Sequence, residues 1–70
     1  MGWLEWKHEL DVAHREYSNG RISSEVYKTR EKFAIYMINK CGNKDAAKKI
    51  AKAHGYRIEE LIKEYQDNNE

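Results

Sequence analysis

Apolar residues along this chain recur at intervals of three and four, which is the spacing of one face of an α-helix. The first series consists of five residues: Trp3, Trp6, Leu10, Ala13 and Tyr17. The segment Ser18-Asn19-Gly20 then offers a stop, because glycine readily takes the left-handed conformation that closes helices. The pattern predicts a first helix over about residues 3–18.

The longest apolar run, Phe33 to Ile38, lies inside a second series that begins at Ile22. Six successive residues of a helix point all the way around its axis, so this run should be covered on several sides. A buried strand is the alternative, but the chain offers no second strand to pair with it. With a serine cap at Ser23-Ser24 and a glycine stop at Gly42, the pattern predicts a central helix over about 24–41.

Two shorter helices are predicted after Gly42. Asn43 is a suitable N-cap for a helix over about 44–54, and Gly55 ends it. Its expected inner face comprises Ala46, Ala47, Ile50, Ala51 and His54. A last apolar face, with the spacing i, i+3, i+4, i+7, predicts a helix over about 57–67. That face comprises Ile58, Leu61, Ile62 and Tyr65.

These elements predict an all-α fold, a compact four-helix domain that spans residues 1–70. An N-terminal helical hairpin (3–41) would pack with a C-terminal helix pair (44–67), and residues 68–70 would form a frayed tail. A chain of 70 residues buries only about 60% of its unfolded surface, so its core is marginal. Homodimerisation would bury more apolar surface, and we therefore expect it as one option.

The composition adds cellular context. Charged residues make up 36% of the chain, proline is absent and Cys41 is the single cysteine. One thiol fits a reducing cytoplasm better than secretion. No apolar segment is long enough to span a bilayer, so no membrane partner is expected.

Charge is unevenly distributed in the second half of the chain. Residues 43–55 carry four basic and one acidic residue, net +3, whereas residues 56–70 carry two basic and five acidic, net −3. Lysines recur every four residues in the third helix, which suits phosphates or an acidic protein surface; the alternative is an ordinary solvated face. The candidate contact residues are Lys44, Lys48, Lys49, Lys52, Arg57 and Lys63.

Trp3 and Trp6 form a second candidate surface. They share the face of Leu10, which favours a role in the core. If they are exposed instead, they would mark a partner-binding or self-association surface.

No constellation of catalytic or metal-binding residues is evident. His8 and His14 are six residues apart and diverge around the helix, and pairing either with Asp11 gives only two ligands, too few for a closed metal site. Cys41 follows a helix C-terminus, which disfavours the thiolate. The sequence therefore predicts a protein that is not an enzyme and has no metal or cofactor.

Two family resemblances overlap in the second half of the chain. Ala51, Gly55 and Leu61 have the spacing of a helix-turn-helix, and this segment resembles small bacterial and phage DNA-binding regulators. That resemblance implies that helix 44–54 crosses the phosphates and that the last helix enters the major groove. The segment Phe33 to Gln66 also looks like the three-helix ubiquitin-associated fold, although Asn43 stands where that family's binding loop has an apolar residue.

Two functions follow as expectations. The leading one is a small regulatory or inhibitory module that binds another protein through the lysines or the Trp3/Trp6 end. The alternative is a helix-turn-helix DNA-binding regulator. Glutamates at 59, 60 and 64 weigh against it, because carboxylates repel DNA phosphates.

Overall fold

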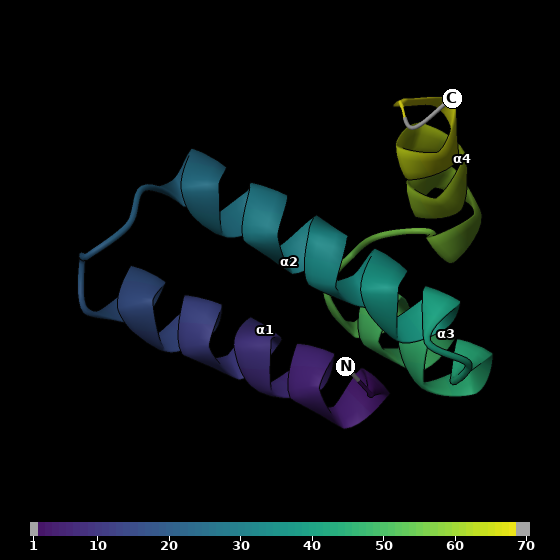
Figure 1. Ribbon diagram of the computed structural model, residues 1–70. Coiled ribbons are helices and arrows are strands. Elements are labelled where there is room, and N and C mark those ends of the chain that lie inside the picture. The colour runs from purple at the N-terminus through teal and green to yellow at the C-terminus, as the bar shows by residue number, and fades with distance from the viewer. Residues whose placement is uncertain (1, 69–70) are drawn as a thin grey trace.

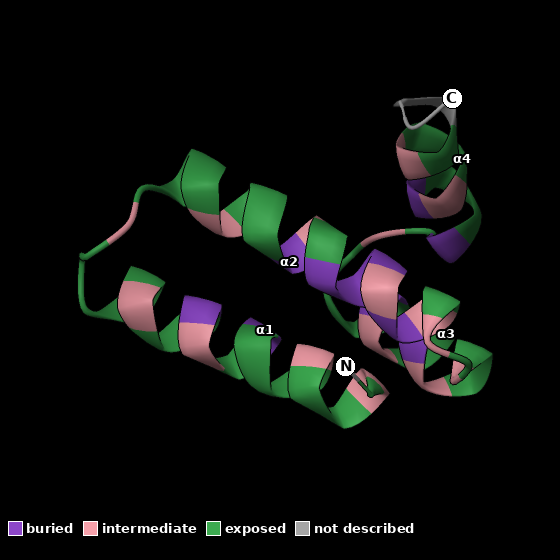
Figure 2. Ribbon diagram, viewed as in Figure 1, coloured by how far each residue is buried: buried purple, intermediate pink, exposed green. Residues whose placement is uncertain are grey.

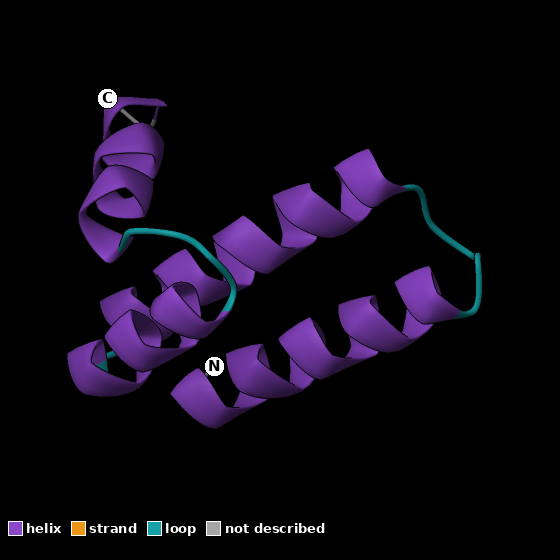
Figure 3. Ribbon diagram, turned by 180° about the vertical axis from the view of Figure 1, so that it is seen from behind, coloured by secondary structure: helices purple, strands orange, loops and turns teal. Residues whose placement is uncertain are grey.

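The computed structural model describes residues 2–68, which contain four α-helices (Figure 1). These are α1 (Trp3–Ser18), α2 (Ser24–Lys40), α3 (Lys44–Ala53) and α4 (Ile58–Asn68). No strand occurs among the described residues (Figure 3), so the predicted all-α fold is confirmed, with helix ends within one residue of those expected. Asn68, predicted to start a frayed tail, belongs to α4; residues 69 and 70 lie outside the described residues.

Side-chain caps explain where α2 and α3 begin. The Ser23 hydroxyl accepts a hydrogen bond from the backbone N–H of Val26 at 3.2 Å. The Asn43 side-chain oxygen accepts one from the N–H of Ala46 at 3.1 Å. Each bond satisfies one of the amide donors that a helix N-terminus leaves without an intrahelical partner. Gly42, with φ of 105°, supplies the left-handed residue that lets the chain reverse between these helices.

The helix α2 is central, as predicted, because it packs against each of the other three helices. It forms an antiparallel hairpin with α1, and α3 lies beside its C-terminal half (Figure 1). The helix α4 leaves the α3–α4 turn at a steep angle to α3 (Figures 1 and 3). The loop end of the hairpin projects beyond α3 and α4, so only two helices are packed together there.

The hydrophobic core lies where α2 meets α3 (Figure 2). Ile35 and Ile38 are fully buried and are the largest side chains in this state. Ala47 and Ala51 are also fully buried, and their small size lets α3 approach α2 closely. The core is completed by four further residues: Leu10, Ala34, Ile58 and Leu61.

The apolar pattern of α2 consists of two stripes rather than one. Ala34, Ile35 and Ile38 face the core. Val26 and Phe33 form the second stripe and are 41% and 38% exposed. The Phe33 ring contacts Trp6 of α1 and Tyr65 of α4, but neither helix closes over it.

Candidate protein-interaction surfaces

Glu31 is the one buried charged side chain among the described residues, at 5% exposure. Its carboxylate accepts a hydrogen bond from the Tyr56 hydroxyl at 2.5 Å and lies 2.6 Å from Nδ1 of His54. An ionised carboxylate can only accept, so Nδ1 carries the hydrogen and donates it. We call Glu31, His54 and Tyr56 the Glu31 cluster. It joins the middle of α2 to the turn between α3 and α4.

The Glu31 cluster also changes the acidity of nearby tyrosines. Burial, followed by the hydrogen bond and the negative charge of Glu31, raises the pKa of Tyr56 well above its ordinary value. Burial and then the carboxylate of Glu31 likewise raise the pKa of Tyr27 to about 12. No buried side-chain nitrogen or oxygen of the described residues lacks a hydrogen-bond partner. Because its polar groups satisfy one another, the cluster serves to position the α3–α4 turn.

The lysines of α3 form an exposed surface, which we call the lysine face: Lys44, Lys48, Lys49 and Lys52. Lys44, Lys48 and Lys52 fall within about 80° of the helix circumference, at about 100° per residue. None of the four forms an ion pair with a carboxylate of the described residues. The helix itself carries four lysines and one aspartate, net +3. The lysine face is therefore free to interact with an anionic surface.

The two other predicted basic residues are placed differently. Arg57 is exposed in the turn just before α4, close in sequence to the lysine face. Lys63 is exposed on α4, where Glu59 and Glu60, four and three residues before it, share its side of the helix. The structure therefore assigns Lys63 to the acidic surface of α4 rather than to the lysine face.

Trp3 and Trp6 are half-buried and pack against the core. The Trp6 ring meets Phe33 edge-on, with ring centroids 5.4 Å apart. Phe33 in turn contacts the ring of Tyr65 on α4, with centroids 5.6 Å apart. The two tryptophans thus support the fold and leave only part of their rings accessible to a partner.

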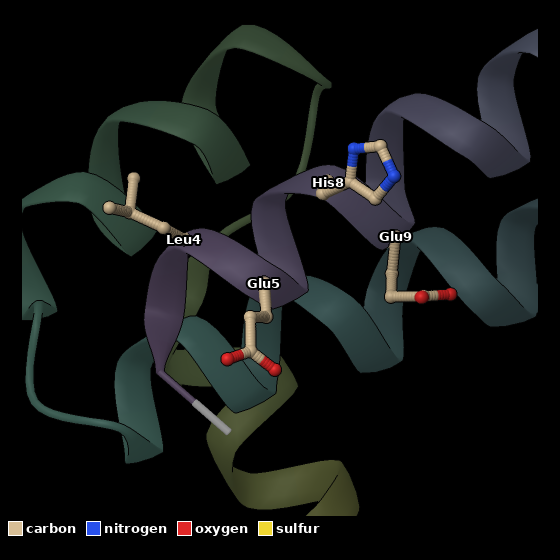
Figure 4. Close-up of a pocket in the computed structure, with 4 residues that line it drawn as sticks. All are labelled: Leu4, Glu5, His8 and Glu9. Atoms are coloured by element: carbon tan, nitrogen blue, oxygen red, sulfur yellow. The ribbon is translucent and has the colours of Figure 1, made fainter.

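A surface that the sequence did not indicate crosses the α1–α2 hairpin. It consists of three shallow depressions, and each shares a residue with the next, Glu9 at one junction and Arg30 at the other. Figure 4 shows the first, which is lined by Leu4, Glu5, His8 and Glu9 of α1. The middle one is a groove of about 170 Å³ between α1 and α2. We call this surface the hairpin track.

The hairpin track is lined mainly by apolar and charged residues. The apolar lining comprises Leu4, Trp6, Val12, Val26, Phe33 and Ala34. In the sequence, Leu4 and Val12 lie outside the inner series of the first helix. Apolar residues away from the core face were the signal that could have revealed this surface.

The remaining candidate residues are dispersed. His8, Glu9, Asp11 and His14 are all exposed on α1. In the described part of the chain, no three histidine, cysteine, aspartate or glutamate side chains gather into a group that could hold a metal ion. Within residues 2–68, no helix has the length and apolar character needed to cross a membrane.

Comparison with protein-family models, with characterised proteins and with solved structures finds no match for this chain. Its function must therefore be inferred from its own surfaces.

Proposed function

We propose that this protein is a small, non-enzymatic regulatory or inhibitory module that binds an acidic surface of another protein through its lysine face. The observation that supports this proposal is the group of four exposed lysines on α3 that have no carboxylate partner among the described residues. The single cysteine is consistent with action in the reducing cytoplasm.

Physical chemistry defines how such a surface works. An exposed ion pair contributes only about 0–1 kcal/mol, so four lysines give modest affinity unless apolar contacts at the edge of the interface add to it. A concentrated patch of positive charge also accelerates association with an acidic partner. Binding should therefore weaken as the salt concentration rises, mainly through slower association.

DNA binding through a helix-turn-helix is the less favoured alternative. Ala51 and Leu61 are buried and Gly55 has φ of 85°, which satisfies the local requirements of that motif. The helix α4 would then have to enter the major groove. Its exposed Glu59 and Glu60 would face DNA phosphates and repel them. The acidic character of α4 favours a protein partner over a nucleic acid.

Affinity capture with matched charge variants tests the proposal. The test variant carries Lys44→Glu, Lys48→Glu and Lys52→Glu. The control variant has the same change in net charge at exposed hairpin positions: Lys7→Glu, Arg15→Glu and Lys28→Glu.

We expect a protein captured by the unmodified chain to be retained by the control and lost with the test variant. The purified partner should then bind more weakly as salt increases. If the captured protein binds the test and control variants equally well, or fails to bind either of them, the lysine face is not the contact surface.

A further inference from the structure

We propose that the hairpin track binds a basic amphipathic helix of another protein. Among the described residues, four large apolar side chains are exposed: Leu4, Tyr17, Val26 and Phe33. All of these except Tyr17 line the hairpin track. Apolar exposure is thus concentrated on one continuous surface, which is typical of an interface.

The charges of the hairpin track favour a positively charged occupant. Its lining carries three glutamates, Glu5, Glu9 and Glu25, and no lysine. Arg30 is the one arginine of the lining, and its guanidinium already lies 3.1 Å from the carboxylate of Glu16. None of the three glutamates forms an ion pair with a basic side chain of the described residues. A cationic partner would supply the counter-charges that these carboxylates lack within the chain.

The charged and apolar side chains are arranged along the track as in other protein interfaces. Glu5 and Glu9 are four residues apart, so they lie on one side of α1 (Figure 4). Glu25 is in the first turn of α2, at the opposite end of the track. Between these ends lies the groove of about 170 Å³, whose lining includes the rings of Trp6 and Phe33. A largely apolar centre with charges around it is the usual composition of a binding surface.

A helix is the occupant that suits this surface. The backbone donors and acceptors of α1 and α2 are used within the helices, so the hairpin offers no strand edge that an extended peptide could join. Recognition must therefore come from side chains. Val26 and Phe33 are seven residues apart on α2, which is the repeat of an amphipathic helix laid alongside it. The apolar residues of that helix would enter the groove, and its lysines or arginines would reach the glutamates.

Other occupants fit the hairpin track less well. A second copy related by two-fold symmetry would bring the glutamates of both tracks together. The chain's own basic helix, α3, could not fill the groove of another copy, because its one large apolar side chain, Ile50, packs against the core. Nucleic acids and anionic lipids would be repelled by the carboxylates.

The hairpin track is independent of the lysine face. The lysine face lies on α3 and contributes no residue to the lining of the track. Binding of a basic helix and binding of an acidic surface can therefore be tested, and can fail, separately.

The test is fluorescence anisotropy of a labelled synthetic peptide titrated with the full chain at low and at physiological salt. The peptide is an amphipathic helix with leucines on one face, at spacings of three and four, and lysines beside them. The control peptide has the same composition, with its leucines distributed around the helix. We expect salt-sensitive binding of the amphipathic peptide and at least about tenfold weaker binding of the control peptide, because only a continuous apolar face can enter the groove.

Matched charge variants of the chain locate the binding surface. The test variant carries Glu5→Gln, Glu9→Gln and Glu25→Gln. It should bind the amphipathic peptide about tenfold more weakly at low salt, because three ion pairs are lost. The control variant has the same change in net charge at exposed carboxylates outside the track, and it should bind like the unmodified chain: Asp11→Asn, Glu59→Gln and Glu60→Gln. The lysine-face variant should bind the peptide no more weakly than the unmodified chain.

Apolar variants test the other half of the contact. Leu4→Ser combined with Val26→Ser should weaken binding of the peptide at least about fivefold, because less apolar surface is buried. Tyr17→Ser is the control, since Tyr17 is as exposed as Val26 but lies outside the track, and it should leave binding unchanged. Circular dichroism verifies that each variant remains helical.

Four results would each overturn the proposal. They are an absence of peptide binding at low salt, equal binding of the two peptides, a glutamine variant that binds as tightly as its control, and a serine variant that does so. Sedimentation equilibrium of the full chain provides a further check. A dimer that dissociates in the Leu4→Ser, Val26→Ser variant would assign the track to a second copy and would also overturn the proposal.

Discussion

Replacing Glu31 by glutamine should destabilise the fold more than any exposed charge substitution. The carboxylate is buried and accepts hydrogen bonds from Tyr56 on one side and His54 on the other. Glutamine keeps the size and one acceptor oxygen, but it removes the negative charge and leaves an amide facing one of the two donors. Glu31→Gln therefore tests whether this cluster holds the α3–α4 turn against α2.

The expected loss follows from the two bonds. A hydrogen bond to a charged group contributes about 1.5–3 kcal/mol, and a neutral one about 0.5–1.5 kcal/mol. Tyr56 and His54 are partly accessible to water, which can replace some of what is lost. We therefore expect Glu31→Gln to lower the free energy of unfolding by about 2–3 kcal/mol. For a domain of this size, that corresponds to a decrease in Tm on the order of 10–20 °C.

Urea unfolding followed by circular dichroism measures this loss, and a double-mutant cycle with Tyr56→Phe assigns it. The two substitutions should be non-additive, with a coupling of about 1–2 kcal/mol, because they remove the same bond. Asp11→Asn, an exposed carboxylate on α1, is the control and should stay within about 0.5 kcal/mol of the unmodified protein. A similarly small effect for Glu31→Gln, or full additivity with Tyr56→Phe, would refute the assigned role.

Three further predictions concern the same fold. The pKa of Tyr27 is raised to about 12 in the folded protein, from an ordinary value of 10. The stabilisation that comes from this difference is complete below pH 10 and is lost as the pH rises toward 12. The urea midpoint should therefore fall between pH 10 and 12, and a constant midpoint would contradict the prediction. Asn43→Ala removes the N-cap of α3 and should lower the free energy of unfolding, measured by thermal unfolding, by about 1 kcal/mol. Asn19→Ala, at an exposed asparagine, is the control and should have a smaller effect. Gly55→Ala should lower the free energy of unfolding by about 1 kcal/mol, because φ of 85° is strained for alanine. An unchanged stability would contradict this and show that the turn relaxes.

The helices could be predicted from sequence because their signals are local. Ser23 and Asn43 are cap residues whose preference depends on hydrogen bonds within the next three residues. Gly42 and Gly55 fill left-handed positions that few other residues tolerate. The position of α2 also followed from the Phe33–Ile38 run, which is too apolar for a helix with a single neighbour.

The Glu31 cluster could not be predicted from the sequence, because His54 and Tyr56 lie 23 and 25 residues from Glu31 in the chain. His54 was expected on the inner face of α3; it lies one residue beyond that helix, and its imidazole contacts Glu31 instead. A glutamate in a helix ordinarily indicates a solvated surface. The one local signal was its spacing, since Glu31 lies four residues after the half-buried Tyr27 and three before the buried Ala34.

The surfaces were predicted only in part, since exposure depends on how the helices pack. Lys44, Lys48 and Lys52 could be assigned to one face by their spacing of four, and the structure exposes them together with Lys49. Whether Trp6 is buried depends on Phe33, which lies on another helix. The hairpin track depends on the same interhelical packing, so no single segment of the sequence reveals it.

The most direct test of the proposed function is a pair of fluorescence anisotropy titrations at low and at physiological salt. One uses a labelled helical peptide with glutamates every four residues, and the other a labelled random-sequence DNA duplex. We expect salt-sensitive binding of the peptide that disappears in the Lys44→Glu, Lys48→Glu, Lys52→Glu variant, and much weaker binding of the duplex. Tighter binding of the duplex, with a salt slope of about three or four, would contradict the proposal and identify the lysine face as a DNA-binding surface.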